Sequence, residues 1–183
     1  FGLTEPEAGS DAGATRTTAR LDGGEWVING SKQFITNSGT EITRFVTVTA
    51  VTGTTAPGGK EVSTIIVPNV TPGFTVGPGY DKVGWHASDT HPLSFEDARV
   101  PEGNLLGERG RGFANFLHIL DEGRIAIAAL ATGAAEGCLE SALEYAGTRS
   151  VFGEPLSTRQ SIQFMLARMR MRVHSARLAW HHA

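Results

Sequence analysis

The chain has 183 residues, of which 40% are hydrophobic and 19% charged, a composition typical of a globular protein with one or two domains. Its formal net charge is −3 and it has no basic run, which argues against a nucleic-acid partner. The single cysteine, Cys138, rules out an internal disulfide and fits a reducing compartment, and no stretch approaches the roughly 20 apolar residues of a membrane span.

The first half of the chain is rich in Gly, Thr and Val and predicts short strands. Strands are expected at residues 15–21, 25–35, 44–51, 62–67 and 93–100. Asn29-Gly30 is expected to interrupt the second strand as a tight turn, and residues 53–59 read as a polar loop. Short strands with frequent turns indicate an antiparallel β-barrel or sandwich domain over residues 1–102.

The second half changes to a helical period. From Gly112 to about Tyr145, apolar residues recur at steps of three and four, which predicts one helix of roughly 50 Å. A second helix is expected from Ser157, which forms a capping box with Gln160. The fold class is therefore α+β, with residues 103–183 forming long antiparallel helices of an incomplete four-helix bundle. The chain is expected to be a fragment, because its last helix has no stop signal.

The opening segment, Phe1-Gly-Leu-Thr-Glu-Pro-Glu-Ala-Gly-Ser-Asp11, is the most informative one. Pro6 and Gly9 make it a loop. A Gly-Ser pair lets backbone amides approach an anion, and Ser10 adds a hydroxyl donor. On composition alone, a polar turn is the more ordinary interpretation.

Five motifs in order change that interpretation. They are the Thr4-to-Asp11 loop, Ile28 to Asn37, Gly84 to Pro101, Gly110 to Phe113, and Arg149 to Gln160. In this order and spacing the sequence resembles the acyl-CoA dehydrogenase family over essentially its whole length. The resemblance implies a middle β domain that binds FAD, followed by the first helices of a C-terminal helical domain.

The resemblance also implies a set of flavin-binding residues. Thr4 would bond the pyrimidine side of the ring, Thr36 would lie near N5, and Arg149 would reach the phosphate of FAD across a dimer interface. Phe34 stands where the family usually has Trp, and both are flat apolar covers. The full implied set is Phe1, Leu3, Thr4, Gly9, Ser10, Phe34, Ile35, Thr36, Arg149, Phe152 and Gln160.

For the substrate, the resemblance implies that Ser10, Asp121 and Arg124 face the acyl-CoA. Taken alone, Asp121 and Arg124 are more simply an exposed ion pair three residues apart on a helix. No catalytic residue is expected in the chain. A minority of the family carries its base one residue before the matching arginine, where this chain has Gly123, and Glu122 is rotated by about 100° from that position. No metal site is predicted.

The implied activity is α,β-dehydrogenation of an acyl-CoA thioester, with electrons passing to an electron-transfer flavoprotein. A homodimer or homotetramer in the cytoplasm, or in the mitochondrial matrix of a eukaryote, is expected, and the fragment is expected to be inactive alone. Two alternatives stay open: an acyl-CoA or nitroalkane oxidase, and a non-catalytic flavin-fold scaffold.

Overall fold

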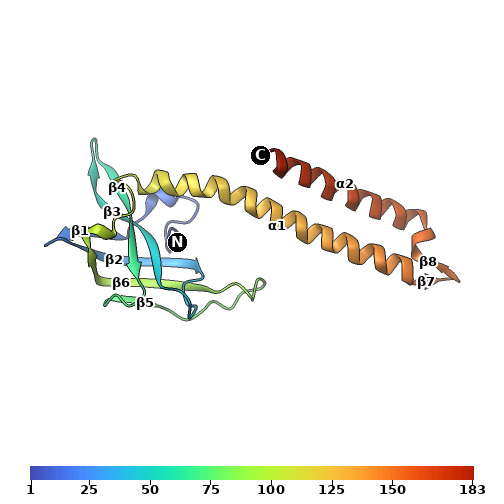
Figure 1. Ribbon diagram of the computed structural model, residues 1–183, viewed down its shortest axis with the longest axis horizontal. Helices are drawn as coiled ribbons and strands as arrows, with labels where there is room; N and C mark the ends of the chain where they lie inside the picture. The colour runs from blue at the N-terminus through green and yellow to red at the C-terminus, as the bar shows by residue number, and fades with distance from the viewer. The chain divides into compact units, whose positions relative to one another are not determined.

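The computed structural model describes residues 1–183, which separate into two compact units, Phe1–Leu117 and His118–Ala183. The division falls inside a helix, and the predicted domain boundary after residue 102 stays a prediction. The first unit contains β1 (Thr18–Asp22), β2 (Glu25–Thr36), β3 (Phe45–Thr55), β4 (Gly59–Pro68), β5 (Phe74–Val76) and β6 (Thr90–Pro101). The second contains most of α1 (Gly112–Thr148), the hairpin of β7 (Ser150–Val151) and β8 (Glu154–Pro155), and α2 (Gln160–His182) (Figure 1).

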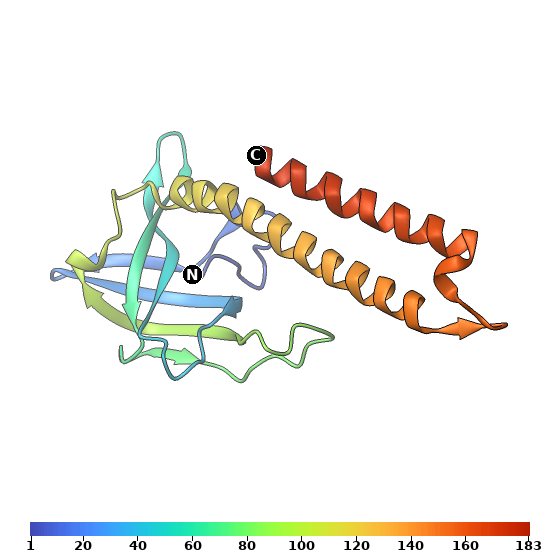
Figure 2. The same cartoon turned by 45° about the vertical axis from the view of Figure 1, so that its right-hand side comes forward.

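The six strands form one sheet in the order β4-β3-β1-β2-β6-β5, which curls into a half-barrel (Figure 2). All neighbours are antiparallel except β1 and β3, which pair in parallel at Thr18 and Val51. The α+β class and the order of a β domain before long helices are confirmed. The predicted β-barrel domain is confirmed in the form of a half-barrel, and its sheet departs from the antiparallel expectation only where β1 lies beside β3.

The concave core explains why these segments are strands. Val46, Val48 and Ala50 alternate along β3 and are buried, as are Ile65 and Val67 of β4. This period of two is the pattern of a strand with one covered face. The strand β5 was not predicted, because it has only three residues; Phe74 anchors it by stacking on Phe95, with ring centroids 5.1 Å apart.

The predicted turn at Asn29-Gly30 is wrong, because β2 continues through it. Asn29 pairs with Thr18 on one side, and its side chain exchanges two hydrogen bonds of 2.9 Å with Asp97. The register with β6 shifts between Ile28 and Gly30, which is a β-bulge. A Cβ on Gly30 would lie 2.7 Å from the Cα of Thr17, so this glycine serves a close backbone approach.

The segment before α1 is fastened to the sheet within the first unit. The Arg109 guanidinium donates to Glu61 at 2.6 Å and to the Thr52 carbonyl at 2.7 Å, and it lies over the Trp26 ring at 5.5 Å. The Gly110 amide donates to Ser63 at 2.9 Å. Residues 107–112, which include Gly107, Gly110 and Gly112, therefore form a structural connection into α1. The first turn of α1 is held against β4.

Replacing Gly112 with alanine is expected to destabilise the first unit by about 1–3 kcal/mol, the usual cost of overpacking. The new Cβ would lie 2.4 Å from the carbonyl carbon of Ser63, a backbone atom that cannot rotate away. Thermal unfolding of the protein measures the loss. Gly103→Ala is the matched control, because its Cβ meets no atom within 4 Å, and an equal loss in both variants would contradict the close-approach argument.

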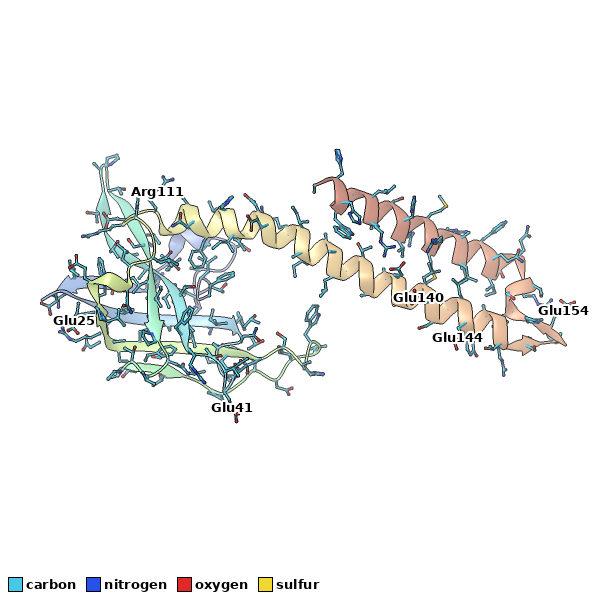
Figure 3. The ribbon with its side chains drawn as sticks, in the orientation of Figure 1. Glu25, Glu41, Arg111, Glu140, Glu144 and Glu154 are labelled. Atoms are coloured by element: carbon cyan, nitrogen blue, oxygen red, sulfur yellow. The ribbon has the colours of Figure 1, made fainter.

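In the second unit the two helices run antiparallel. The α1 residues buried there are Thr132, Leu139 and Ala146, seven apart, and Thr132 lines the same groove as the buried Val173 of α2. Arg177 and Glu136 form an ion pair between the helices, with one hydrogen bond of 3.0 Å. Glu140 and Glu144 lie one turn apart on the exposed side of α1 (Figure 3).

The predicted capping box at the start of α2 is wrong. Ser157 lies in a short 3₁₀ turn, α2 begins at Gln160, and the N-cap residue is Arg159, which makes no side-chain cap. Ser157 instead accepts a hydrogen bond of 2.8 Å at its carbonyl from the Gln163 side chain. The extra turn follows Pro155, whose fixed φ continues the extended chain before helix starts.

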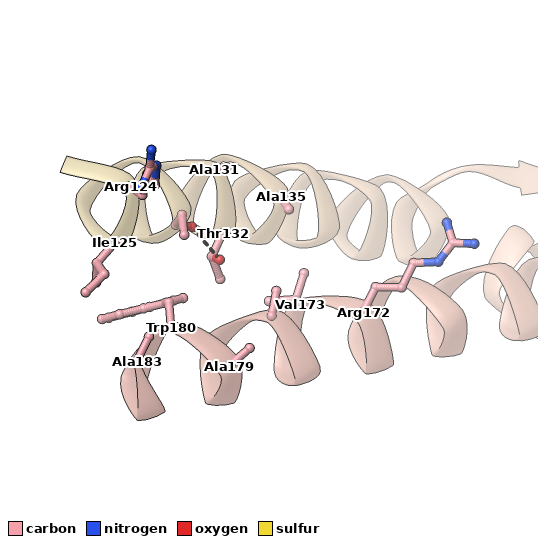
Figure 4. A pocket seen from close by; sticks show the side chains of 12 residues that line it. Arg124, Ile125, Ala131, Thr132, Ala135, Arg172, Val173, Ala179, Trp180 and Ala183 are labelled. Atoms are coloured by element: carbon pink, nitrogen blue, oxygen red, sulfur yellow. Dashed lines mark hydrogen bonds between the residues drawn. The ribbon is translucent and has the colours of Figure 1, made fainter. Parts of the chain in front are cut away.

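A groove of about 640 Å³ runs between α1 and α2 (Figure 4). Small side chains such as Ala131 and Ala135 line it, with Trp180 and Ile125 near one end. By length and composition alone α1 could cross a membrane, but one such helix is weak support, since helices in protein cores pass the same test. The absence of a membrane span stays a prediction.

Candidate functional site

The N-terminal segment is built into the sheet of the first unit. Because β1 and β3 pair only at Thr18 and Val51, the rest of the gap between β3 and β2 is open to another strand-like segment. Gly2 fills it on the β3 side, donating to Thr47 at 2.7 Å and accepting from Thr49 at 3.1 Å. On the β2 side, the Thr4 carbonyl accepts from the Gln33 amide at 2.8 Å. The predicted loop is thus held at its start by two strands.

A buried ion pair lies beneath this segment. The Lys32 side chain of β2 is 0% exposed, and its Nζ lies 2.7 Å from Oε1 of Glu5. Burial by itself would raise the pKa of Glu5, but hydrogen bonds from Lys32, Thr15 and the Arg16 amide outweigh burial and lower that pKa to about 2. Burial lowers the pKa of Lys32, and the contact with Glu5 opposes this effect.

The end of β2 carries an exposed aromatic on a bulge. The register with β6 shifts between Lys32 and Ile35, and Phe34 has a φ of 59°, an unusual conformation for a bulky side chain. Its ring is 59% exposed and lies 4.9 Å from the ring of Tyr80. A bulge of this kind re-aims a side chain, and such backbone outliers cluster at functional sites.

A histidine–aspartate pair braces the turn that follows Thr36. His91 sends Nδ1 toward the Gly77 carbonyl and Nε2 toward Asp89, each at 2.7 Å. The other oxygen of Asp89 accepts from the Gly39 amide at 2.9 Å, and its carbonyl accepts from the Asn37 amide. His91 belongs to β6.

This pair predicts a pH dependence of stability. Since the Gly77 carbonyl and the Asp89 carboxylate both accept, His91 satisfies both only as the imidazolium, and these contacts raise its pKa above 6.5, against a smaller opposing effect of burial. A raised folded pKa means that the stabilisation is present below pH 6.5 and is lost as the pH rises through the folded value. Thermal unfolding from pH 6 to 9 should show this loss in the wild type and a flatter profile in His91→Gln. Identical profiles would contradict the assignment.

Four of the predicted residues of the first unit, Thr4 and the residues from Phe34 to Thr36, lie at the end of the sheet where β2 finishes, and this end is named the sheet edge. Thr4 lies beside Gln33, next to the Phe34 bulge. Phe1 is exposed, with its ring edge-on to Phe116 at 5.1 Å. Of the other predicted residues, the exposed ones are Gly9, Ser10 and Thr36, and the buried ones are Leu3 and Ile35.

The hairpin residues cluster separately in the second unit. Phe152, at the tip between β7 and β8, has a φ of 56° and is 93% exposed. The Arg159 guanidinium lies 5.9 Å from its ring and donates to the Val151 carbonyl at 3.0 Å. Arg149 and Gln160 flank the hairpin and are exposed.

The predicted substrate pair lies elsewhere on α1. Asp121 and Arg124 form an exposed ion pair three residues apart. From Arg124 to the end of α1 at Thr148 the helix runs about 36 Å at 1.5 Å per residue. The pair and the hairpin of one chain are therefore too far apart to contact the same small group.

Comparisons with known proteins identify the family. Residues 1–98 match the family model for the acyl-CoA dehydrogenase middle domain, and residues 110–183 match the model for the acyl-CoA dehydrogenase C-terminal domain. The chain belongs to the acyl-CoA dehydrogenase family. The resemblance inferred from the five motifs is confirmed.

Individual relatives of this acyl-CoA dehydrogenase family member agree with the family models. The mitochondrial short-chain specific acyl-CoA dehydrogenase of Mus musculus is 48% identical over 97% of this chain and 42% of its own length. The structure of butyryl-CoA dehydrogenase from Megasphaera elsdenii is similar with a TM-score of 0.93 at 44% identity, over 99% of this chain and 47% of that one. An acyl-CoA dehydrogenase from Bacillus anthracis, solved in complex with FAD, has a TM-score of 0.88 at 37% identity, over 96% and 29%. The chain spans less than half the length of the curated relatives it matches.

Sequence reasoning missed several features of the family member's site region. No role was predicted for Glu5 or Lys32, although Glu5 lies in the Thr4-to-Asp11 motif and Lys32 in the Ile28-to-Asn37 motif. The bulge at Phe34 was not predicted either. A lysine four residues before the end of an apolar strand is a weak signal, because only a long-range partner makes its burial possible. No group of three His, Cys, Asp or Glu side chains that could hold a metal ion is present.

Proposed function

We propose that this chain is part of an FAD-dependent acyl-CoA dehydrogenase, which oxidises an acyl-CoA thioester at its α and β carbons. The observation that carries the proposal is the sheet edge where the Thr4 segment is bonded to β2 beside the Phe34 bulge. That edge presents an exposed aromatic ring and threonine hydroxyls on a backbone held by two strands. Catalytic sites need this kind of rigid support.

The donor set at this edge fits FAD. A flavin has a flat ring with a polar margin, and the exposed rings of Phe1 and Phe34 match the flat part, while the hydroxyls of Thr4 and Thr36 match the margin. The loop beyond them leaves room for an anionic tail, because a Cβ on Gly9 would meet no atom within 4 Å and Ser10 is exposed. When bound, FAD supplies the acceptor for the hydride that leaves the β-carbon.

The remaining predicted residues have roles in binding. We assign Arg149, Phe152 and Gln160 to the FAD of a second subunit, since the hairpin is about 36 Å along α1 from the Asp121–Arg124 pair. We assign Asp121, Arg124 and Ser10 to the acyl-CoA. This division favours a homodimer or homotetramer.

The proton-abstracting carboxylate is assigned to a part of the protein outside residues 1–183. Gly123 has no side chain to serve as base. The neighbouring Glu122 side chain is 80% exposed and faces His118, with 3.9 Å between Oε1 and Nε2. A general base must instead reach the α-carbon proton at hydrogen-bond distance.

Short acyl chains are the substrates we propose, supported by the names of the mouse and Megasphaera elsdenii relatives. An electron-transfer flavoprotein is the proposed electron acceptor. For location we propose the cytoplasm, or the mitochondrial matrix in a eukaryote, which the single cysteine supports.

Anaerobic titration of the purified full-length protein with butyryl-CoA tests the proposal. The protein is expected to be yellow, and its visible flavin band is expected to bleach, with a scan over acyl lengths showing strongest bleaching for short chains. A colourless protein would overturn the proposal in favour of a non-catalytic scaffold. Rapid recovery of the colour on admitting air would indicate an oxidase.

A further inference from the structure

The Lys32 ammonium joins three segments that are distant in sequence. Its Nζ lies 3.2 Å from the Leu3 carbonyl, 2.7 Å from the Glu5 carboxylate and 3.0 Å from the Thr49 hydroxyl. A further acceptor, the Thr15 hydroxyl, lies 3.3 Å away. Every proton of the ammonium therefore has an acceptor inside a cage that excludes solvent.

The Glu5 carboxylate extends this network across the base of the N-terminal loop. It accepts from the Arg16 amide at 2.6 Å, from the Thr17 amide at 3.1 Å and from the Thr15 hydroxyl. The Glu5 carboxylate thus joins the two ends of the loop formed by residues 6–14, which includes Gly9 and Ser10. The loop's shape depends on this closure.

Stability alone does not account for a buried pair at this place. An ion pair in the interior loses most of its Coulomb gain to desolvation, and a packed apolar pair of the same volume is often as stable or more stable. An apolar pair, however, could not bond the Leu3 carbonyl or the amides of Arg16 and Thr17. What the pair provides is a defined backbone position for the segment on either side of Thr4.

We propose that Lys32 is a positioning residue for cofactor binding, acting through Glu5 and the Leu3 carbonyl to place Thr4 and the Ser10 loop. The inference rests on the proposed function. With a side chain that is 0% exposed, Lys32 cannot touch the cofactor itself. It also precedes Phe34 by two residues in β2, so its ammonium links the strand that carries the Phe34 bulge to the segment that carries Thr4.

The test compares three variants of the full-length protein: Lys32→Met, the double variant Glu5→Gln/Lys32→Met, and the control Val100→Ala. Val100 is a buried core residue at the other end of β2's partner strand, paired with Trp26, so its truncation lowers stability without touching the network. The measurements are thermal unfolding of the apoprotein and the dissociation constant of FAD, from titration of the apoprotein.

Lys32→Met is expected to lose the most stability, because it leaves a buried carboxylate unpaired, and the double variant is expected to recover much of that loss. Both should bind FAD at least about tenfold more weakly than the wild type, because a loop that is no longer held in place loses hydrogen bonds to the cofactor. The control should change the dissociation constant less than about twofold.

Two results would overturn the inference. One is a double variant that binds FAD within twofold of the wild type. The other is a control that loses FAD affinity as much as the double variant does, which would make the effect one of stability alone. A wild-type protein that binds no FAD would instead overturn the proposed function, so the two failures are distinguishable.

Discussion

Glu5→Ala is expected to lower the free energy of unfolding by about 3–5 kcal/mol, the loss typical of a buried charge that is left without its partner. The Lys32 ammonium would keep only neutral acceptors in a cage that admits no solvent. Urea denaturation of the full-length protein measures the loss as a lower midpoint at an unchanged slope.

Glu7→Ala is the matched control for this prediction. Glu7 lies two residues away and pairs with Arg16, but its side chain is 58% exposed. Exposed pairs contribute about 0–1 kcal/mol. Equal losses in the two variants would show that the Glu5–Lys32 pair has no special place in the fold.

The Glu5 carboxylate should also contribute to the loss of folding stability at acid pH. Its folded pKa of about 2 lies below the ordinary 4.5, so its stabilisation is complete above about pH 4.5 and is lost as the pH falls toward 2. Glu5→Ala should lack this part of the acid dependence. A variant whose stability falls with acid as steeply as the wild type would assign the acid sensitivity to other carboxylates.

The elements with regular periods were predictable from the sequence. The β-branched runs around Val48 and Ile65 became central strands, and the apolar residues recurring every three to four positions became α1 and α2. Local patterns suffice there because the spacing of apolar residues identifies a strand or helix with one buried face, whichever element covers that face. The β5 strand was missed because three residues carry no period.

The errors fall where distant residues decide the local geometry. Asn29-Gly30 has the composition of a turn, yet Thr17 and Asp97 hold it in a bulged strand. Along α1, the apolar residues Ile127 and Leu143 belong to the recurring pattern but are exposed, while Thr132 is buried. The helix face was misplaced because α1 pairs with α2 along a seven-residue repeat that the longer apolar pattern obscures.

The candidate site shows the same division. The motifs point to Thr4, Phe34 and Arg149 as site residues, because a family resemblance carries residue positions directly, and these assignments stay predictions. They did not show that Phe34 adopts a left-handed conformation or that Lys32 is buried, since both depend on contacts with β6 and the N-terminal segment. The distance between the hairpin and the Asp121–Arg124 pair likewise depends on the structure, in which one continuous helix separates them.

The distance between the hairpin and the Asp121–Arg124 pair suggests that Arg149 serves the FAD of a second subunit, which predicts a large effect of replacing it. Arg149→Met in the full-length protein is expected to lower dehydrogenase activity by about 100-fold or more, because an arginine that holds a phosphate forms strong charge-assisted hydrogen bonds. Arg168→Met is the matched control, an exposed arginine of α2 in the same unit, and it should keep nearly full activity. The readout is the turnover of butyryl-CoA with an artificial electron acceptor.

Mixing subunits then tests whether Arg149 serves the partner's site. A second variant, Thr4→Ala/Thr36→Ala, removes the hydroxyls at the sheet edge and should be similarly inactive by itself. In a mixed dimer that shares its sites, one site carries both lesions and the other carries none. After denaturation and refolding of an equal mixture, about a quarter of all sites should be intact, since half of the dimers are mixed. Because the hairpin and the sheet edge would then come from different chains, activity should return although neither parent is active. If the mixture stays as inactive as its parents, Arg149 acts within its own subunit.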